Sequence, residues 1–275
     1  MSNPGEIPVG GNDMGVNRKR NLKVIVLDAA IVCCITVLGV TGTFIYKHYH
    51  QLNESNDKIR ALQKSVNTPD NAENDQFTPT KEFYKQMKER YPDYIGWLVW
   101  DTEIVSEPVV QGRSNQEYLR KDIDGEYDIY GTVFMDALDT LDDSNLMLYG
   151  HSIPGDYHSV VKFNQLQNML SKDFAEQHKC FRFYLEDRVD VYEVFSAFQY
   201  GADICDPYDY SQNTFVDTDA FQEWINQSLN HSLIGYRDSE TTTVDDHYMT
   251  LQTCADDYGG AKDIVIAIRI GSEEY

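Results

Sequence analysis

The sequence has few basic residues and few cysteines, and it lacks the spacing of a metal site. Its 275 residues include 23 Lys and Arg against 45 Asp and Glu, giving a formal net charge of −22. Nucleic-acid binding needs a basic face, so this acidic balance argues against it. Five cysteines are too few for a disulfide framework. No His or Cys spacing matches a zinc site, so neither a metal nor another cofactor is predicted.

A run of aspartates could gather Ca²⁺, whose protein ligands are mostly carboxylate and carbonyl oxygens. The run consists of Asp136, Asp139, Asp142 and Asp143. It lacks the EF-hand spacing and the glycine of that loop. We therefore expect a solvated loop at these positions.

An apolar run extends from Val24 to Tyr46 and is interrupted only by Asp28. Its 23 residues are long enough to cross a bilayer. A cleavable signal peptide is the alternative, but its apolar region is shorter and ends at a small-residue site, which does not follow here. The basic residues at 18–20 and 23 place the N-terminus in the cytoplasm by the positive-inside rule. We expect a single-pass cell-membrane protein whose remainder is extracellular.

The composition changes along the chain and predicts four segments. Residues 1–22 form a disordered cytoplasmic tail and 23–46 a transmembrane helix. Residues 47–80 form a stalk and a polar linker, and 81–275 the folded extracellular domain. Residues 1–46 carry a formal charge of +1 and the remainder −23, which fits two different environments.

From residue 94 onward, short apolar segments alternate with turns, as in all-β domains. A short helix is expected between Pro79 and Pro92, and two more at 160–171 and 219–230, the last with a capping box at Asp219 and Gln222. This pattern predicts a mainly β fold, a barrel or a sandwich, with added helices. Strands are expected at 95–100, 109–110, 132–135, 146–149, 181–185, 189–199, 248–253 and 264–270.

Two residues that could do chemistry follow predicted strands directly. Cys254 directly follows the segment 248–253 and opens a glycine-containing loop, where a rigid scaffold can aim its thiol. His151 comes after the apolar strand 146–149 and Gly150. A thiol needs a base or a cation to ionise it, and two such strand ends could bring a His–Cys pair together. A buried cysteine and a structural histidine are the alternatives.

The residues around both positions match a known family. The sequence TLQTC at 250–254 resembles the TLxTC signature of class B sortases, which ends in the nucleophile. YGH at 149–151 resembles the motif that carries the catalytic histidine of these enzymes. The resemblance covers about residues 81–270 and includes the helix before the penultimate strand. Further matches are IGW at 95–97, PVVQG at 108–112, Asn115, YL at 118–119 and GTVFMD at 131–136.

Class B sortases are membrane-anchored cysteine transpeptidases of Gram-positive bacteria. The resemblance implies a sortase-type closed β-barrel behind one transmembrane helix, with Cys254 and His151 catalytic. It also implies cleavage of a C-terminal sorting signal on secreted proteins, through a thioacyl-enzyme, and their attachment to peptidoglycan or its precursor amine. A pilus-polymerising sortase and a catalytically weakened surface-interaction module are the alternatives.

One departure from the family concerns the oxyanion. Sortases carry an arginine at the start of the last strand, where this chain has Asp263. Arg269 lies on the same strand but about 20 Å further along, too far to substitute. Lys262 through a register shift, Arg237 from another loop, and Thr253 beside the nucleophile are the candidates for oxyanion or substrate contacts. Cys180 and Cys205 flank a predicted strand pair, and a disulfide between them stays open.

Overall fold

The structure, a computed structural model, describes residues 22–65, 77–100, 104–152, 162–201, 208–235, 243, 245–253 and 261–275. The chain divides into two compact units, Met1–Tyr49 and His50–Tyr275. Cys205, Arg237 and Cys254 lie outside the described residues, and so does the proposed pairing of Cys180 with Cys205.

Helix α1 (Leu22–Ser65) begins in the first unit and ends in the second. It contains an 18-residue window of mean hydropathy 2.5 with none of its residues buried, so its length and composition suit a single membrane span. Within the second unit, Leu52, Ile59 and Leu62 are buried. Their spacing of seven and three residues puts them on one helical face. Lys58 bonds the buried carboxylate of Asp122 beside this face.

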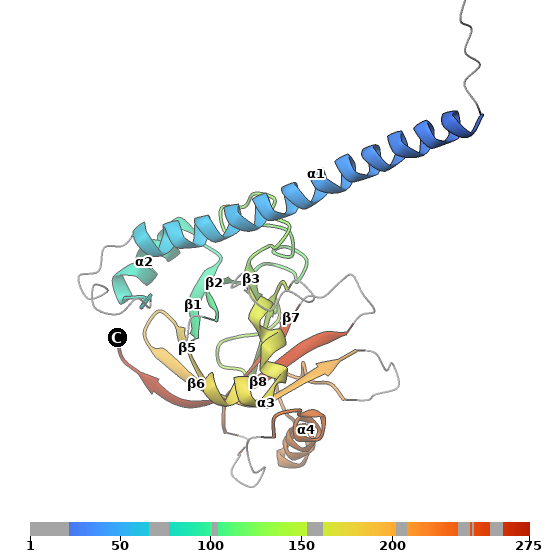
Figure 1. The fold of residues 1–275 in the computed structure, drawn as a ribbon. Helices are drawn as coiled ribbons and strands as arrows, with labels where there is room; N and C mark the ends of the chain where they lie inside the picture. Colours follow the sequence, from blue (N-terminus) through green and yellow to red (C-terminus); the bar gives the residue numbers. More distant parts are fainter. Residues whose placement is uncertain are drawn as a thin grey trace, which may run out of the picture. The chain divides into compact units, whose positions relative to one another are not determined.

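Eight strands close into a barrel in the order β1-β2-β3-β4-β7-β8-β6-β5 (Figure 1). Every strand expected from the sequence is present, and closure decides for a barrel over a sandwich. The strands are β1 (Tyr94–Trp100), β2 (Ser106–Val110), β3 (Val133–Met135), β4 (Asn145–Gly150), β5 (Cys180–Tyr184), β6 (Val189–Tyr200), β7 (Tyr248–Thr253) and β8 (Lys262–Glu273).

Two of the strand pairings are parallel, β2 with β3 and β4 with β7. The second joins segments about a hundred residues apart, in a register that runs from Asn145 opposite Tyr248 to Gly150 opposite Thr253. Inside β4 and β7, Leu146, Leu148 and Leu251 are buried in one apolar cluster. Full burial of such a side chain contributes roughly 1.5–3 kcal/mol, so the register is strongly favoured.

The helices differ in detail from the expected ones. Helix α2 (Lys81–Arg90) has Thr80 as N-cap, whose side chain accepts a bond from the backbone N–H of Phe83. Helix α4 (Thr218–His231) packs against β6. Its N-cap is Asp217, which accepts from the N–H of Ala220. The predicted capping box at Asp219 and Gln222 is therefore wrong, because an aspartate two residues earlier occupies the cap position.

The helix expected at 160–171 is present over a shorter range and is not an α-helix. Over the described part of that range the chain forms a 3₁₀ helix, η2 (Asn164–Leu170), followed by α3 (Lys172–Gln177). Phe163, Leu166 and Met169 insert into the main core cluster. Their spacing of three residues suits three residues per turn better than the 3.6 of an α-helix. Tertiary packing therefore decides the helix type.

A buried ion pair anchors the chain just before η2. The Lys162 side chain lies 3.2 Å from Glu107 of β2, and the two side chains are 3% and 2% exposed. The backbone N–H of Lys162 donates to the other Glu107 oxygen at 3.0 Å. Burial raises the pKa of Glu107, and the neighbouring Lys162 opposes this shift. Lys162 also has a φ of +50°, in the left-handed region, so the pair holds a strained residue in place.

Replacing Lys162 with Met is expected to lower the free energy of unfolding by about 3–5 kcal/mol, because Glu107 then keeps a buried carboxyl without its cation. The measurement is denaturant unfolding of the full-length protein in detergent micelles. Lys172→Met is the control, since Lys172 and Glu176 form an exposed pair at 3.9 Å, and it should cost less than about 1 kcal/mol. Equal losses in the two variants would contradict the role of the buried pair.

Candidate active site

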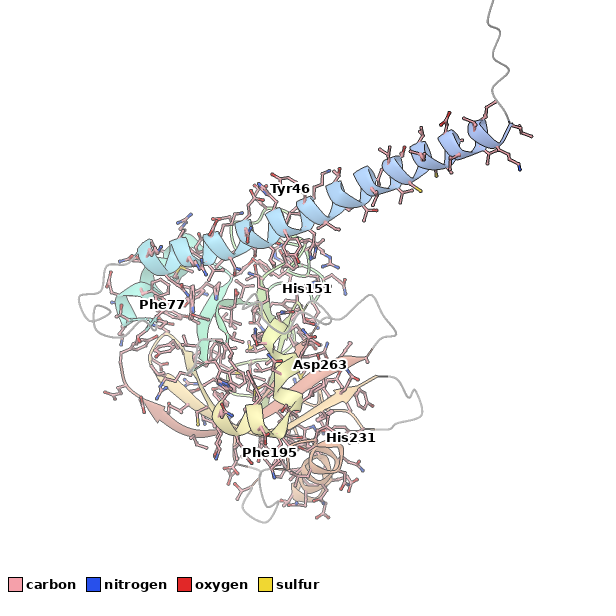
Figure 2. All side chains as sticks on the ribbon, viewed as in Figure 1. Tyr46, Phe77, His151, Phe195, His231 and Asp263 are labelled. Carbon is pink, nitrogen blue, oxygen red and sulfur yellow. The ribbon has the colours of Figure 1, made fainter. Side chains whose placement is uncertain are left out.

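His151 follows β4 directly, and the residue before it must be glycine. A Cβ atom on Gly150 would lie 2.5 Å from the ring of Phe163, so that ring packs flush against the glycine backbone. The backbone N–H of Phe163 donates to the carbonyl of His151 at 3.0 Å. His151, which is labelled in Figure 2, is thus held on its backbone side by Phe163.

The side chain of His151 faces a hairpin formed by residues 118–132. Backbone bonds from Asp128 to Arg120 and from Thr132 to Tyr118, both 3.1 Å, hold the two arms together. The buried Tyr130 ring meets the imidazole edge-on, with centroids 5.3 Å apart. Arg120 Nη1 lies 3.5 Å from His151 Nδ1 and also donates to the carbonyl of Ile129. Two side chains of one hairpin therefore orient the ring.

The end of β7 lies beside the end of β4. Thr253 is the last residue of β7 and pairs with Gly150, the last residue of β4. The two strands are parallel, and paired positions on neighbouring strands lie about 4.8 Å apart. His151 comes directly after Gly150 and Cys254 directly after Thr253, so both follow paired positions. The fold thus brings the neighbourhoods of both sequence-predicted residues together, although Cys254 itself lies outside the described residues.

Thr253 and Asp263 are engaged with each other. The Thr253 hydroxyl oxygen accepts from the backbone N–H of Asp263 at 2.9 Å, and Thr253 is fully buried. Asp263 Oδ1 accepts from Gln199 Nε2 at 3.1 Å. Burial raises the pKa of Asp263, and the bond from Gln199 opposes this shift. At the position where the family's arginine was expected, this chain therefore has a buried carboxyl group with an amide partner.

The cationic candidates on β8 are placed differently from one another. Lys262 is half-buried and lies opposite Tyr200 in the β6–β8 pairing, at the same end of β8 as Asp263. Arg269 donates to the buried Asp190 at 3.5 Å and belongs to a structural ion cluster with Arg188. Its bond to Asp190 agrees with the expectation that Arg269 does not replace the arginine.

The acidic run after β3 is only in part the solvated loop that its composition suggested, since Asp142 is exposed and Asp139 is buried. Asp139 is 6% exposed and accepts from the N–H of Met147 and from Asn213. Asp136 accepts from the hydroxyl of Tyr149, next to the YGH glycine, and from Asn115. These carboxylates accept bonds from strand and loop donors that would otherwise be unsatisfied, which turn-forming aspartates do readily.

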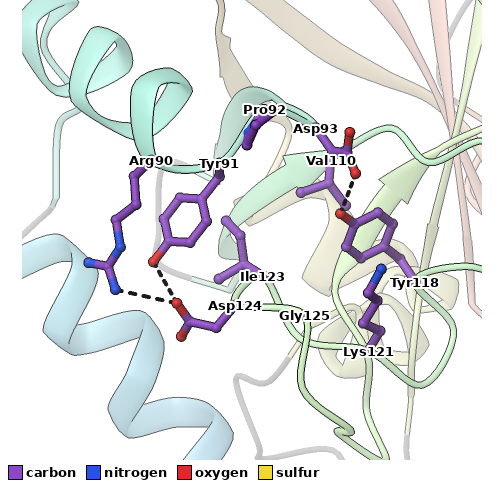
Figure 3. Close-up of a pocket in the computed structure, with 10 residues that line it drawn as sticks. All are labelled: Arg90, Tyr91, Pro92, Asp93, Val110, Tyr118, Lys121, Ile123, Asp124 and Gly125. Atoms are coloured by element: carbon purple, nitrogen blue, oxygen red, sulfur yellow. Dashed lines mark hydrogen bonds and ion pairs between the residues drawn. The ribbon is translucent and has the colours of Figure 1, made fainter.

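A hollow of about 320 Å³ lies between the end of α2 and the 118–132 hairpin (Figure 3). Its carboxylates Asp93 and Asp124 accept from the hydroxyls of Tyr118 and Tyr91. Arg90 also bonds Asp124. Since these polar groups are engaged with one another, this hollow offers less chemistry than the strand ends around His151.

Arg120, Tyr130 and Gln199 were not among the residues selected from the sequence. Arg120 directly follows the YL pair at 118–119, but nothing in its local pattern marks it as a neighbour of His151. Its contact crosses 31 positions of the chain. Gln199 lies 64 positions from Asp263, and only the β6–β8 register joins them. Long-range pairing, not local sequence, creates these contacts.

Comparisons with known proteins find relatives along most of the chain. The chain is 26% identical over 244 residues to sortase B of Staphylococcus aureus, an alignment that covers 87% of this chain and 94% of that protein. It is 27% identical over 227 residues to sortase B of Listeria monocytogenes, covering 79% and 87%. No protein-family model matches the chain.

Solved structures show the same fold. A Staphylococcus aureus sortase B–substrate complex superposes with a TM-score of 0.64 at 25% identity, covering 78% of this chain and 95% of that one. A sortase B complexed with triglycine gives 0.61 at 27% identity, covering 70% and 87%. The closed barrel of this chain, with its paired ends of β4 and β7, is therefore similar in fold to sortases. The curated relatives and the solved structures that the chain resembles are class B sortases.

The buried Asp139 makes stability depend on pH in a specific direction. Burial raises its pKa from 3.8 to about 6, so the native state binds a proton more tightly than the unfolded chain. Its contribution to stability is therefore full below pH 3.8 and is lost as the pH rises through about 6. Unfolding of wild type and Asp139→Asn should be compared across this range. The stability of wild type relative to the variant should fall as the pH rises; a pH-independent difference would exclude the assignment.

Proposed function

We propose that this transpeptidase cleaves a C-terminal sorting signal of secreted proteins and joins them covalently to the cell wall. The observation that carries the proposal is the parallel register of β4 and β7, which makes His151 and Cys254 follow from paired positions. Placement directly after two paired strand ends supports a nucleophile and an acid–base partner acting together. Related structures are a substrate complex and a triglycine complex, which suit a peptide donor and an amine acceptor.

The chemistry is acyl transfer in two halves. As the proton of the Cys254 thiol passes to His151, the sulfur attacks a peptide carbonyl carbon, and the C–N bond breaks as His151 gives a proton to the departing amine. The product is a thioacyl-enzyme. A peptidoglycan amine then attacks the same carbonyl and gives up a proton to His151, and the C–S bond breaks to release the thiolate. Backbone N–H groups or a nearby cation would stabilise each tetrahedral oxyanion.

The membrane arrangement belongs to the same proposal. The apolar part of α1 anchors the chain in the cell membrane as a single span with the N-terminus in the cytoplasm. The polar segment after it and the barrel then lie outside, where secreted proteins and wall precursors are found. The acidic body, with a charge of −23 outside residues 1–46, suits an aqueous exterior and not a nucleic-acid partner.

One observation favours a second possibility. A buried carboxyl group, Asp263, stands at the start of β8, and it does not supply the fixed positive charge of an arginine there. A catalytically weakened module that still binds a partner would explain that replacement. A pilus-polymerising enzyme would differ in the amine, using a lysine of another subunit. Product analysis separates these outcomes.

Cys254→Ala is expected to abolish thioacyl formation, because no other residue of the TLQTC segment supplies a sulfur nucleophile. The full-length protein in detergent micelles is incubated with a sorting-peptide library and triglycine, and adducts and products are identified by mass spectrometry. Cys180→Ala is the matched control and should retain the wild-type rate.

Cleavage by Cys254→Ala at the wild-type rate would overturn the nucleophile assignment. Absence of any turnover by the wild type, with retained peptide binding, would instead support the weakened module. Transfer to a pilin lysine in preference to triglycine would indicate polymerisation. Each result therefore points to one of the three functions.

A further inference from the structure

The contact between Arg120 and His151 joins two parts of the molecule that the proposed mechanism treats separately. Arg120 is half-buried on the 118–132 hairpin, and its Nη1 lies 3.5 Å from His151 Nδ1. The same nitrogen donates to the carbonyl of Ile129 in the other arm of the hairpin. The guanidinium is thus held by the hairpin backbone as well as by the imidazole.

The hairpin is itself firmly placed. Gly131 has a φ of +60°, and a Cβ there would lie 2.2 Å from the carbonyl oxygen of Tyr118, so glycine permits the close approach of the two arms. Tyr130 is 2% exposed and shares a small apolar cluster with Leu52 of α1. Arg120 is therefore presented to His151 by an ordered element and not by a loose surface loop.

Hydrogen-bond chemistry restricts what this contact means. A guanidinium only donates, so His151 Nδ1 must be the acceptor. In a neutral imidazole whose Nδ1 accepts, the hydrogen is on Nε2. Adding a second proton at Nδ1 would remove the acceptor and place two cations against each other. The geometry therefore disfavours the imidazolium and makes it a stronger acid once formed.

Described residues of several elements lie around His151. On the hairpin side, the ring faces Arg120 and the edge of Tyr130. From the η2 side, the Phe163 backbone N–H contacts the His151 carbonyl and not its ring. On the β7 side, Cys254 follows the residue paired with Gly150. The nearby buried cation Lys162 is neutralised by Glu107 at 3.2 Å.

We propose that Arg120 is a positioning residue of the transfer reaction, which holds His151 neutral with its hydrogen on Nε2 in the resting enzyme. When the ring takes up the Cys254 thiol proton at Nδ1, the bond from Arg120 is lost, and the resulting imidazolium is a stronger acid that gives its Nε2 proton to the departing amine. The fixed charge of Arg120 also favours negative charge developing next to the ring, on the sulfur or the oxyanion. The proposal rests on the proposed function, because it gives His151 its acid–base part. Arg120 lies on the connection between β2 and β3. The cation beside His151 therefore does not come from the start of β8, where Asp263 stands.

The test compares full-length wild type, Arg120→Gln and Arg120→Lys in detergent micelles, each labelled with ¹⁵N-histidine. The ring nitrogens of His151, assigned with His151→Gln, are followed by NMR as the pH is varied. Wild type should show the Nε2–H tautomer. Its titration midpoint should move to higher pH in Arg120→Gln, which lacks the charge, and stay near the wild-type value in Arg120→Lys. A merely structural role would not move this midpoint.

Activity supplies the second measurement. Thioacyl formation with a sorting peptide should fall about tenfold or more in Arg120→Gln, mainly in kcat and not in KM, because Arg120 acts through His151. Lysine, which keeps the charge but not the planar fork, should restore part of the rate. Arg113→Gln is the matched control, an exposed arginine on the same connection between β2 and β3, and should behave as wild type.

The two measurements separate the possible failures. An unchanged His151 titration in Arg120→Gln, or a resting ring with its hydrogen on Nδ1, would overturn the role of Arg120 whatever the activity. Absence of peptide turnover by the wild type would refute the proposed function. The titration of His151 would still show whether Arg120 acts on the ring. A shifted titration with an unchanged rate of thioacyl formation would overturn the catalytic part of the inference.

Discussion

The parallel pairing of β4 with β7 is the constraint on which the site depends. It joins segments about a hundred residues apart, and its last pair is Gly150 opposite Thr253. A slip of one residue would turn the buried leucines of both strands toward the wrong face, so the core enforces the register. The same register makes His151 and Cys254 follow from adjacent positions. Packing of the two strands thus fixes the relation between Gly150 and Thr253, the residues that precede His151 and Cys254.

Around that pairing, two further parts of the chain contact His151. Phe163 packs on Gly150 and is preceded by Lys162, which is paired with the buried Glu107. The 118–132 hairpin supplies a tyrosine edge and a guanidinium to the imidazole. A histidine ring that is contacted on several sides loses little orientational freedom during the reaction, which is the usual requirement for efficient proton transfer.

At the start of β8, an aspartate occupies the position where an arginine was expected. Asp263 is buried, accepts from Gln199 and uses its backbone N–H to bond Thr253. A buried carboxyl group of this kind favours its neutral form, because desolvation penalises the charge. Its side chain accepts a hydrogen bond from Gln199, the residue opposite it in the β6–β8 pairing. The cation that contacts His151 comes instead from Arg120, on the connection between β2 and β3.

Local sequence was sufficient for the strands, for α2 and α4, and for the two motifs that mark the site. Alternating apolar residues and turn residues report directly on which segments become strands, and TLQTC and YGH are contiguous. Tertiary structure decided what depends on distant partners. It selected a 3₁₀ helix over an α-helix at η2, buried Asp139 in place of a solvated loop, and brought Arg120 to His151. The last two outcomes follow from contacts across 8 and 31 positions of sequence, whose energies no local pattern contains.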